Sequence, residues 1–263
     1  MKKLDAKLII NGTISLQEKA VIISILKRLG ESKMTESSHS FLPGTEETIW
    51  EAAVRGTKSF GSFAKISSAI SIMDVILAAN RNYEKVVGPH VKRMRKEYPG
   101  LTLRGLSKMT LDAHDASSFK SIWGHNDSRK FEILKSVLSV FLLEIDCIDT
   151  VENDYNVVSG WAKSANLQEK AIDKIGSIKG IGVATFQHLR MVFGVDTVKP
   201  DLRVRQVLER EFGLKASAAT SVRLVEEFAR ISELSPLFID QIMVKYGSGY
   251  YYNKSIGLIK NCS

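Results

Sequence analysis

The stretch IGSIKGIGVATFQHLRMVFGVDTVKPDLRVRQV, residues 175–207, indicates how the rest of the chain is organised. Its pattern predicts a helix that ends near Ile178, a tight turn at Gly180-Ile181-Gly182, and a second helix from about Val183 to Phe193. The two glycines let the backbone bend sharply and approach another surface, because neither carries a Cβ. The first N–H groups of the second helix have no partner within it, so they can donate to an anion. The hairpin therefore suits a phosphate backbone.

Residues 178–185, which read IKGIGVAT, resemble the hairpin of the helix-hairpin-helix DNA glycosylase superfamily, the endonuclease III-like enzymes. In that superfamily an apolar residue is followed by Pro, Gly, Val or Ile, Gly, two variable residues and Thr, so Lys179 stands in the place of the proline. The superfamily then has Phe-Gly and, after a connector, an Asp that leads a short helix. Phe193-Gly194 and Asp201 match these features in the same order. The resemblance covers roughly residues 66–213 and extends more weakly beyond them.

Two aspartates compete for the place of the superfamily's aspartate. Asp196 lies in Val195-Asp196-Thr197, which matches the superfamily's Val-Asp-Thr letter by letter. If Asp196 began the helix, however, Pro200 would fall after the first turn, where its missing N–H group and its ring are unfavourable. With Asp201 as the N-cap, Pro200 lies just outside the helix, and apolar residues follow at helical spacing. We therefore expect the helix to begin after Asp201.

The composition is typical of a globular protein and favours a polyanionic partner. The chain has 263 residues, 44% of them hydrophobic and 25% charged, with a formal net charge of +8. The longest apolar run, around residues 137–148, is interrupted by polar and charged residues, so we expect no membrane span. Two cysteines, Cys147 and Cys262, are too few for a disulfide framework or a zinc site. The apolar patch near the start is too short for a signal peptide, and we expect a cytoplasmic (nucleoid-associated) or nuclear protein that is not secreted.

Helical periodicity recurs along the chain and no segment convincingly predicts a strand, so the expected fold class is all-α, with about ten helices. The resemblance implies a two-lobed helical fold with a central cleft. Residues 66–194 would form a six-helix lobe that includes the hairpin. Residues 1–65 would form a helical segment that packs with the C-terminal lobe, residues 195–263, which carries the aspartate.

The resemblance implies a monofunctional DNA glycosylase, a DNA-repair enzyme that hydrolyses the N-glycosidic bond of a damaged or mispaired base. The ionised carboxylate of Asp201 would stabilise the positive sugar as this bond breaks, as carboxylates do in glycoside hydrolysis. Bifunctional members carry a lysine at the position of Ala184, and alanine offers no amine for a Schiff base. The iron–sulfur loop of some members needs four cysteines after the catalytic region, where this chain has only Cys262. We therefore expect no cofactor.

The implied partner is double-stranded DNA with a flipped-out base, with no membrane and no obligate protein partner. Asn80 matches a residue that enters the gap left by the base, and His125 matches one that wedges between bases. Trp123 and Trp161 are candidates for stacking on the flipped base, although large aromatic residues more often lie in the core. We expect no metal site built from side chains, but a monovalent cation on the hairpin carbonyl groups. The hairpin residues expected to contact DNA are Lys179, Gly180, Ile181, Gly182, Ala184 and Thr185.

Other functions fit parts of the same sequence. A catalytically inactive DNA-binding protein of this fold is consistent with Lys179, with Ala184, and with an N-terminal segment that matches no motif. A glycosylase with lyase activity from another lysine is a third alternative. Asp201 has a plain helix N-cap as its alternative role, and Asn80 and His125 have that of ordinary loop residues. The sequence does not identify the excised base, because the side chains of such a pocket are scattered along the chain.

Overall fold

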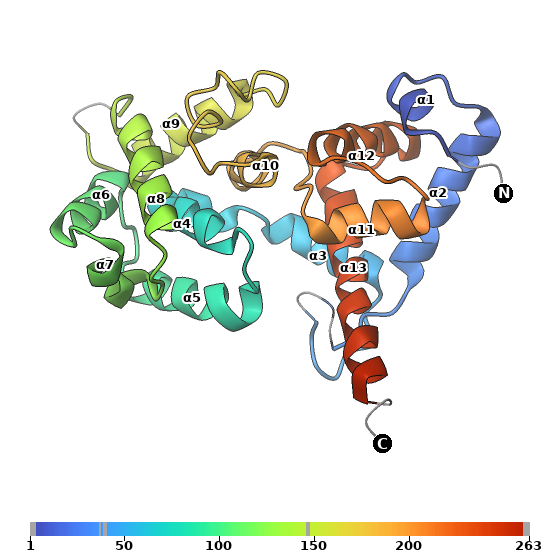
Figure 1. Ribbon diagram of the computed structural model, residues 1–263, viewed down its shortest axis with the longest axis horizontal. Coiled ribbons are helices and arrows are strands. Elements are labelled where there is room, and N and C mark those ends of the chain that lie inside the picture. Colours follow the sequence, from blue (N-terminus) through green and yellow to red (C-terminus); the bar gives the residue numbers. More distant parts are fainter. Residues whose placement is uncertain (1–3, 37, 39–40, 146–147, 260–263) are drawn as a thin grey trace. The chain divides into compact units, whose positions relative to one another are not determined.

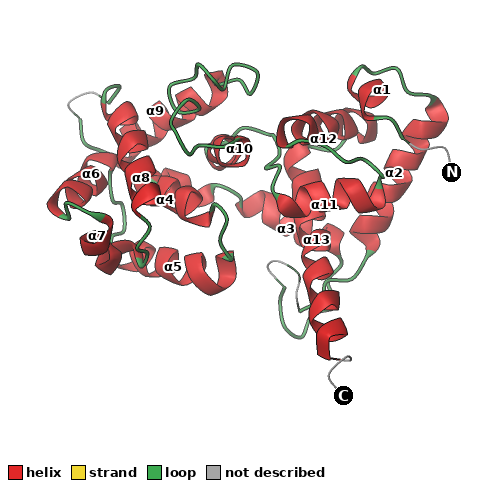
Figure 2. Ribbon diagram, viewed as in Figure 1, coloured by secondary structure: helices red, strands yellow, loops and turns green. Residues whose placement is uncertain are grey.

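The computed structural model describes residues 4–36, 38, 41–145 and 148–259, which form helices joined by turns and short loops (Figure 1 and Figure 2). Within this part of the chain there is no strand, and an isolated bridge joins Lys33 and Thr48. The prediction of an all-α fold is confirmed. Cys147 and Cys262 lie outside the described residues.

The chain divides into two compact units. The first combines Met1–Ser59 with Asp196–Ser263, and the second is the continuous segment Phe60–Val195. The sequence analysis places the two boundaries after residues 65 and 194. The predicted catalytic aspartate and the hairpin therefore belong to different units.

In the first unit, helices from both ends of the chain pack on one another. They are α1 (Ala6–Ile10), α2 (Leu16–Glu31), α3 (Ile49–Ser59), α11 (Leu202–Glu211), α12 (Ala218–Ser232) and α13 (Pro236–Ile259). Helix α13 packs against α2, α3, α11 and α12, and α1 packs against α12. The predicted capping box at the start of α2 is present, because Glu18 N donates to Ser15 Oγ and Ser15 N donates to the Glu18 carboxylate.

In the second unit, one buried helix lies at the centre of the core. The elements are the 3₁₀ helix η1 (Ser62–Lys65), α4 (Ser68–Ala78), the π-helix η2 (Tyr83–Val87), α5 (Gly88–Glu97), α6 (Leu103–Asp112), α7 (Ala116–Trp123), α8 (Ser128–Leu142), α9 (Val151–Ser164) and α10 (Val183–Val192). Every residue of α4 except Asp74 is buried. A helix that is apolar on all sides belongs inside a core, and α4 contacts α5, α6, α8, α9 and α10.

Polar side chains in the loops decide where the helices of the second unit begin. At the N-caps of five α-helices of this unit, the side-chain oxygen accepts a hydrogen bond from an N–H group of the first turn. Each cap satisfies a donor that the helix itself leaves free. These N-caps are Ser67, Thr102, Asp115, Asp127 and Thr150.

The first arm of the predicted hairpin is not a regular helix, which corrects the prediction of a helix ending near Ile178. Residues 167–180 form successive turns instead. Asp173 Oδ1 accepts hydrogen bonds from the N–H groups of residues 175 and 176, so these donors do not enter a helical ladder. Gly176 also lies against Lys170 O, from which a Cβ would be only 2.4 Å away. Side-chain competition for backbone donors therefore overrides the helical spacing of the apolar residues.

Two further helix boundaries differ from the sequence expectation. The sequence predicts that the last helix ends at Gly247, but α13 continues to Ile259. At Gly247 a Cβ would lie 3.2 Å from both Arg203 O and Val207 Cγ2, so this glycine permits close packing of α13 on α11 rather than ending the helix. A single helix predicted over residues 106–119 is two helices, α6 and α7, because Asp115 caps the second.

Asp154 is a buried carboxylate that joins two helices of the second unit. It lies on α9 with no exposed surface, and its Oδ2 accepts a hydrogen bond from Leu103 N at 2.7 Å, at the start of α6. Its Oδ1 is buried without a hydrogen-bond partner. Burial raises the pKa of Asp154 to about 6, opposed by the hydrogen bond from Leu103.

We predict that Asp154 makes the protein less stable as the pH rises from about 4 to about 7. The folded state holds this proton more tightly than the unfolded state, so the free energy of unfolding falls across that interval. In Asp154→Asn this component is absent, and the variant should gain about 2–3 kcal/mol relative to wild type over the interval. Urea unfolding of both proteins at several pH values measures the difference; parallel stability curves would contradict the prediction.

Candidate nucleic-acid interface

The hairpin is closed by one tight turn in the second unit. Ile181 N donates to Ile178 O at 3.0 Å, and Gly180, the third residue of this turn, has a φ of 100°. Type II turns have a positive φ at the third position, which favours glycine, and commonly have proline at the second. Lys179 occupies that second position. Lys179, which stands in the place of the superfamily's proline, therefore adds a cation to the turn. Gly180 still supplies the positive φ that the turn requires.

The two glycines of the hairpin have different surroundings. At Gly180 a Cβ would lie 2.4 Å from Ile133 Cδ1 on α8, and the positive φ adds strain for any other residue. Gly182 has a φ of −78°, and a Cβ on it would meet no atom within 4 Å. Packing on α8 therefore requires glycine at position 180, whereas Gly182 leaves bare backbone that faces open space.

Helix α10 begins directly at the hairpin, with Gly182 as its N-cap. No side chain of the described residues caps this helix start, so the N–H groups of the first turn can donate outward. Ala184 and Thr185 lie in this first turn and are partly exposed. The helix dipole places a partial positive charge at the same end. Such a helix start suits an anion with several acceptor oxygens, for example a phosphate diester.

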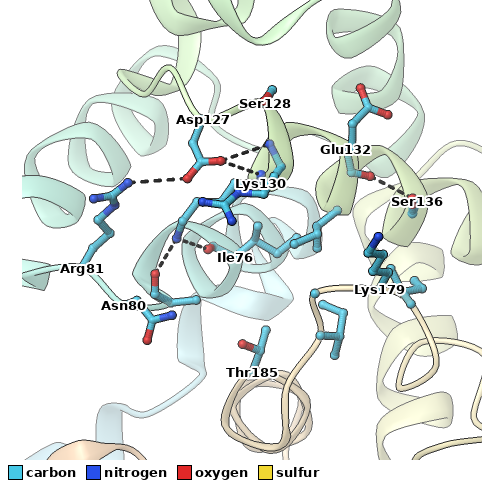
Figure 3. Close-up of a pocket in the computed structure, with 16 residues that line it drawn as sticks. Ile76, Asn80, Arg81, Asp127, Ser128, Lys130, Glu132, Ser136, Lys179 and Thr185 are labelled. Carbon is cyan, nitrogen blue, oxygen red and sulfur yellow. Dashed lines mark hydrogen bonds and ion pairs between the residues drawn. The ribbon is translucent and has the colours of Figure 1, made fainter.

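A groove of about 940 Å³ lies beside the hairpin in the second unit (Figure 3). Its walls come from the end of α4 with the turn that follows, from the start of α8, and from the hairpin with the first turn of α10. The cationic side chains outnumber the anionic ones, which favours an anionic ligand. The charged lining residues are Arg81, Arg129, Lys130 and Lys179 against Asp127 and Glu132.

Asn80 and Arg81 form the turn after α4 on one wall of this groove. Asn80 has a φ of 57° and is exposed. Arg81 Nη2 donates to His125 Nε2 at 3.2 Å and pairs with Asp127 Oδ2 at 3.5 Å, next to the start of α8. The His125 side chain is 19% exposed, and burial, followed by the charge of Arg81, lowers its pKa. A neutral His125 accepts the bond from Arg81 and so supports that side chain, whereas the exposed Asn80 lines the groove itself.

Lys130 belongs to this site and was not singled out from the sequence. It is 9% exposed, and its Nζ donates to Ile76 O, Leu77 O and Ala79 O at 2.9, 2.8 and 2.6 Å; Figure 3 shows the bond to Ile76. A cation at a helix C-terminus satisfies carbonyl groups that the helix leaves free and complements its dipole. Burial lowers the pKa of this amine to about 8. These bonds fasten the end of α4, and with it the turn that carries Asn80, to α8.

Trp123 and Trp161 lie in the core and not in an open pocket, which corrects their assignment to the base-binding site. Trp123 is 0% exposed, and its Nε1 donates to His125 O. Trp161 is 4% exposed, and its Nε1 donates to the Asp173 carboxylate at 3.1 Å. Each ring also packs edge-on against a phenylalanine, Phe119 for Trp123 and Phe141 for Trp161. Packing with a satisfied indole N–H therefore accounts for both residues.

In the first unit, Asp201 is the N-cap of α11, as the position of Pro200 predicts. Its Oδ1 accepts from Arg203 N at 2.9 Å and from Val204 N at 3.2 Å, and the residue is partly exposed. Asp196 acts on a different helix, because its Oδ1 accepts from Leu237 N at 2.9 Å in the first turn of α13. The two aspartates that compete in the sequence therefore have separate structural roles.

We predict that substitution by alanine affects the stability of the protein much more at Gly180 than at Gly182. Gly180→Ala should lower the free energy of unfolding by about 1–3 kcal/mol, because the new Cβ meets Ile133 and the positive φ is strained. Gly182→Ala, the matched control, should change it by less than about 1 kcal/mol. Denaturant unfolding of both variants measures this, and equal losses would contradict the separate roles.

Three of the predicted site elements gather at one groove of the second unit: the hairpin and Asn80 line it, and His125 adjoins it through Arg81. Among the described residues, no group of three His, Cys, Asp or Glu side chains is arranged to hold a metal ion. None of the helices in that part of the chain offers an apolar stretch of bilayer-spanning length. No family model, curated protein or solved structure matches the chain.

Proposed function

We propose that this protein is a monofunctional DNA glycosylase that hydrolyses the N-glycosidic bond of a damaged or mispaired base in duplex DNA. The observation that supports this most is the cationic groove at the hairpin. The groove brings together the uncapped start of α10, the exposed side chain of Asn80 and three exposed basic side chains. These basic residues are Arg81, Arg129 and Lys179. That surface combines hydrogen-bond donors for phosphate oxygens with the polar side chain of Asn80, which would enter the gap that a flipped-out base leaves in the duplex.

The second unit would hold the DNA backbone. The first-turn N–H groups of α10 would donate to one phosphate, and the bare backbone at Gly182 would let that phosphate approach closely. Lys179 and Arg129 would neutralise neighbouring phosphates and release their counterions. The net charge of +8 adds a long-range attraction to the polyanion.

The first unit would supply the catalytic group. When the bond between C1′ and the base nitrogen breaks, positive charge develops on the deoxyribose, and a nearby carboxylate stabilises it. Asp201 would provide that carboxylate. The departing base would take up a proton from solvent, and a water molecule would add to C1′ and release a proton to solvent. The products are an abasic site and the free base.

Ala184 supports hydrolysis over lyase chemistry in this proposal. A lyase requires an amine that attacks C1′ and forms a Schiff base, and the position that would present this amine carries a methyl group. Each turnover would then leave an intact strand with an abasic site, which breaks only on treatment with alkali.

We predict that Asp201→Asn lowers the excision rate at least about a hundredfold with little loss of stability. Asparagine is as good an N-cap as aspartate, so the bonds to Arg203 N and Val204 N can persist while the charge is removed. Asp196→Asn is the matched control, because it makes the same change at the other capping aspartate, and its rate should stay within about twofold of wild type. The assay uses duplexes that each contain one damaged or mismatched base, followed by alkali and separation of the strands.

The same assay distinguishes the alternatives. Binding of every duplex without release of any base would favour a DNA-binding protein that lacks activity. Equal rates in wild type and Asp201→Asn would refute the catalytic role of Asp201. Trapping of a covalent protein–DNA adduct by borohydride would establish a lyase and refute the argument from Ala184.

We predict that two hairpin variants weaken DNA binding in different ways. Lys179→Pro keeps a residue suited to the turn but removes one cation, so the slope of log K against log salt concentration should become shallower by about 0.9. Gly182→Ala keeps every charge but places a methyl group where the phosphate approaches, so affinity should fall about tenfold with the slope unchanged. Fluorescence anisotropy over a range of salt concentrations measures both quantities. Unchanged affinity and slope in both variants would place the DNA elsewhere on the protein.

A further inference from the structure

The segment that leads to Asp201 is fastened to the rest of the first unit by several side chains. Lys199 N donates to Asp240 Oδ1 on α13 at 3.0 Å. Thr197 Oγ1 donates to Glu226 Oε1 on α12 at 3.1 Å. Together with the bond from Leu237 N to Asp196, these contacts hold residues 196–199 against the two helices.

Among these contacts, the one made by Asp240 lies nearest to Asp201. Asp240 is 3% exposed. The Lys199 peptide that it holds is also bonded on its other side, because Asp201 N donates to Lys199 O at 2.7 Å. Pro200, between them, has a fixed φ and no N–H group. A stiff, short path of two hydrogen bonds therefore joins the buried carboxyl group to the backbone of Asp201.

We propose that Asp240 is a positioning residue for Asp201: its buried carboxyl group holds the Lys199 amide and thereby fixes where the Asp201 carboxylate lies. This inference rests on the proposed function, because it assigns to Asp240 a role in the reaction that Asp201 would catalyse. A displacement of about 1 Å in a reacting group costs roughly a hundredfold in rate, so a rigid support has a measurable effect.

The charges around Asp240 are consistent with this role. Burial and, after it, the negative charge of Asp201 raise the pKa of Asp240 to about 7, against the opposing effects of the Lys199 N–H group, the Lys199 charge and the Lys245 charge. Lys245 lies one turn further along α13, and the charges that act on it include Arg55 and Glu47. The negative charge of Asp201 thus acts on the Asp240 carboxyl group. Either protonation state of Asp240 retains an oxygen that accepts from Lys199 N.

Three variants on one helix separate positioning from simple stabilisation of α13. Asp240→Ala removes the acceptor for Lys199 N. Asp240→Asn keeps an acceptor of the same size and removes the charge. Gln241→Met alters the adjacent buried polar residue, which is 7% exposed and bonds to Lys245 rather than to the segment 196–201. It therefore controls for a general loss of stability caused by changing a buried polar residue of the same helix.

The first measurement needs no substrate. Amide hydrogen exchange, followed by NMR in the full-length protein, reports whether the segment is held. We expect the amides of Lys199 and Asp201 to exchange at least about tenfold faster in Asp240→Ala and to stay protected in Asp240→Asn and Gln241→Met. Unchanged protection in Asp240→Ala would overturn the positioning role whatever the protein's activity.

The second measurement uses the excision assay. Asp240→Ala should lower kcat about tenfold to a hundredfold with KM for the duplex unchanged, and Asp240→Asn should restore most of the rate. Equal rate losses in Asp240→Ala and Gln241→Met would show a purely structural effect and overturn the proposal. If wild type releases no base, the proposed function fails, and the exchange measurement still decides whether Asp240 holds the segment.

If Asp240→Ala does not fold, a comparison of wild type with Asp201→Asn, in both of which Asp240 is intact, keeps the proposal testable. The negative charge of Asp201 raises the pKa of Asp240, so the ¹³C titration midpoint of the Asp240 carboxyl should be lower in Asp201→Asn than in wild type. An unchanged midpoint would show that the two groups are not coupled and would contradict the arrangement on which the proposal depends.

Discussion

The contact between Gly180 and Ile133 is the constraint on which the candidate interface depends. It seats the hairpin directly on α8, with no room for a side chain between them. Three residues earlier on the same helix, Lys130 holds the last carbonyl groups of α4. A single helix therefore sets the spacing between the N–H groups at the start of α10 and the turn that carries Asn80 and Arg81. Rigid helices position such groups more accurately than loops do.

Local sequence rules account for the parts of the structure that depend on nearby residues. The position of Pro200 was enough to distinguish the helix start at Asp201 from the competing Asp196, because the cost of a proline inside a helix is a property of the backbone. The glycine turn followed from the need for a positive φ. Capping residues such as Ser15 and Glu18 predicted the start of α2 correctly. The all-helical character followed from apolar periodicity alone.

The parts that could not be predicted depend on contacts between distant residues or on competition for the same donors. Lys130 holds carbonyl groups more than 50 residues earlier in the chain; the one local sign was a lysine one turn before Leu134 on the buried stripe of α8. Asp240 holds an amide 41 residues away. Asp173 takes the donors that a helix over residues 167–178 would have needed. For Trp123 and Trp161, aromatic character did not distinguish a stacking surface from the core.

Three buried charged side chains serve the same purpose, which is to hold backbone at the end of another element. Lys130 does so for α4, Asp154 for the start of α6, and Asp240 for the segment before α11. Burying such a group costs free energy unless it is hydrogen-bonded, and each of these is bonded to peptide groups. In each case the buried group fixes a loop or a helix end in one conformation.

The division of the chain has a consequence for its biosynthesis. The second unit is one uninterrupted segment whose two ends meet, since a Cβ on Gly61 would lie 2.5 Å from Val192 O. It can therefore close while its last residues have only just left the ribosome. Helices α2 and α3 emerge earlier and can contact each other, but the faces that they pack against α12 and α13 stay uncovered until those two helices follow. The nascent chain therefore exposes this apolar surface while residues 60–195 are being translated, and α2 and α3 are where a chaperone would bind the growing polypeptide.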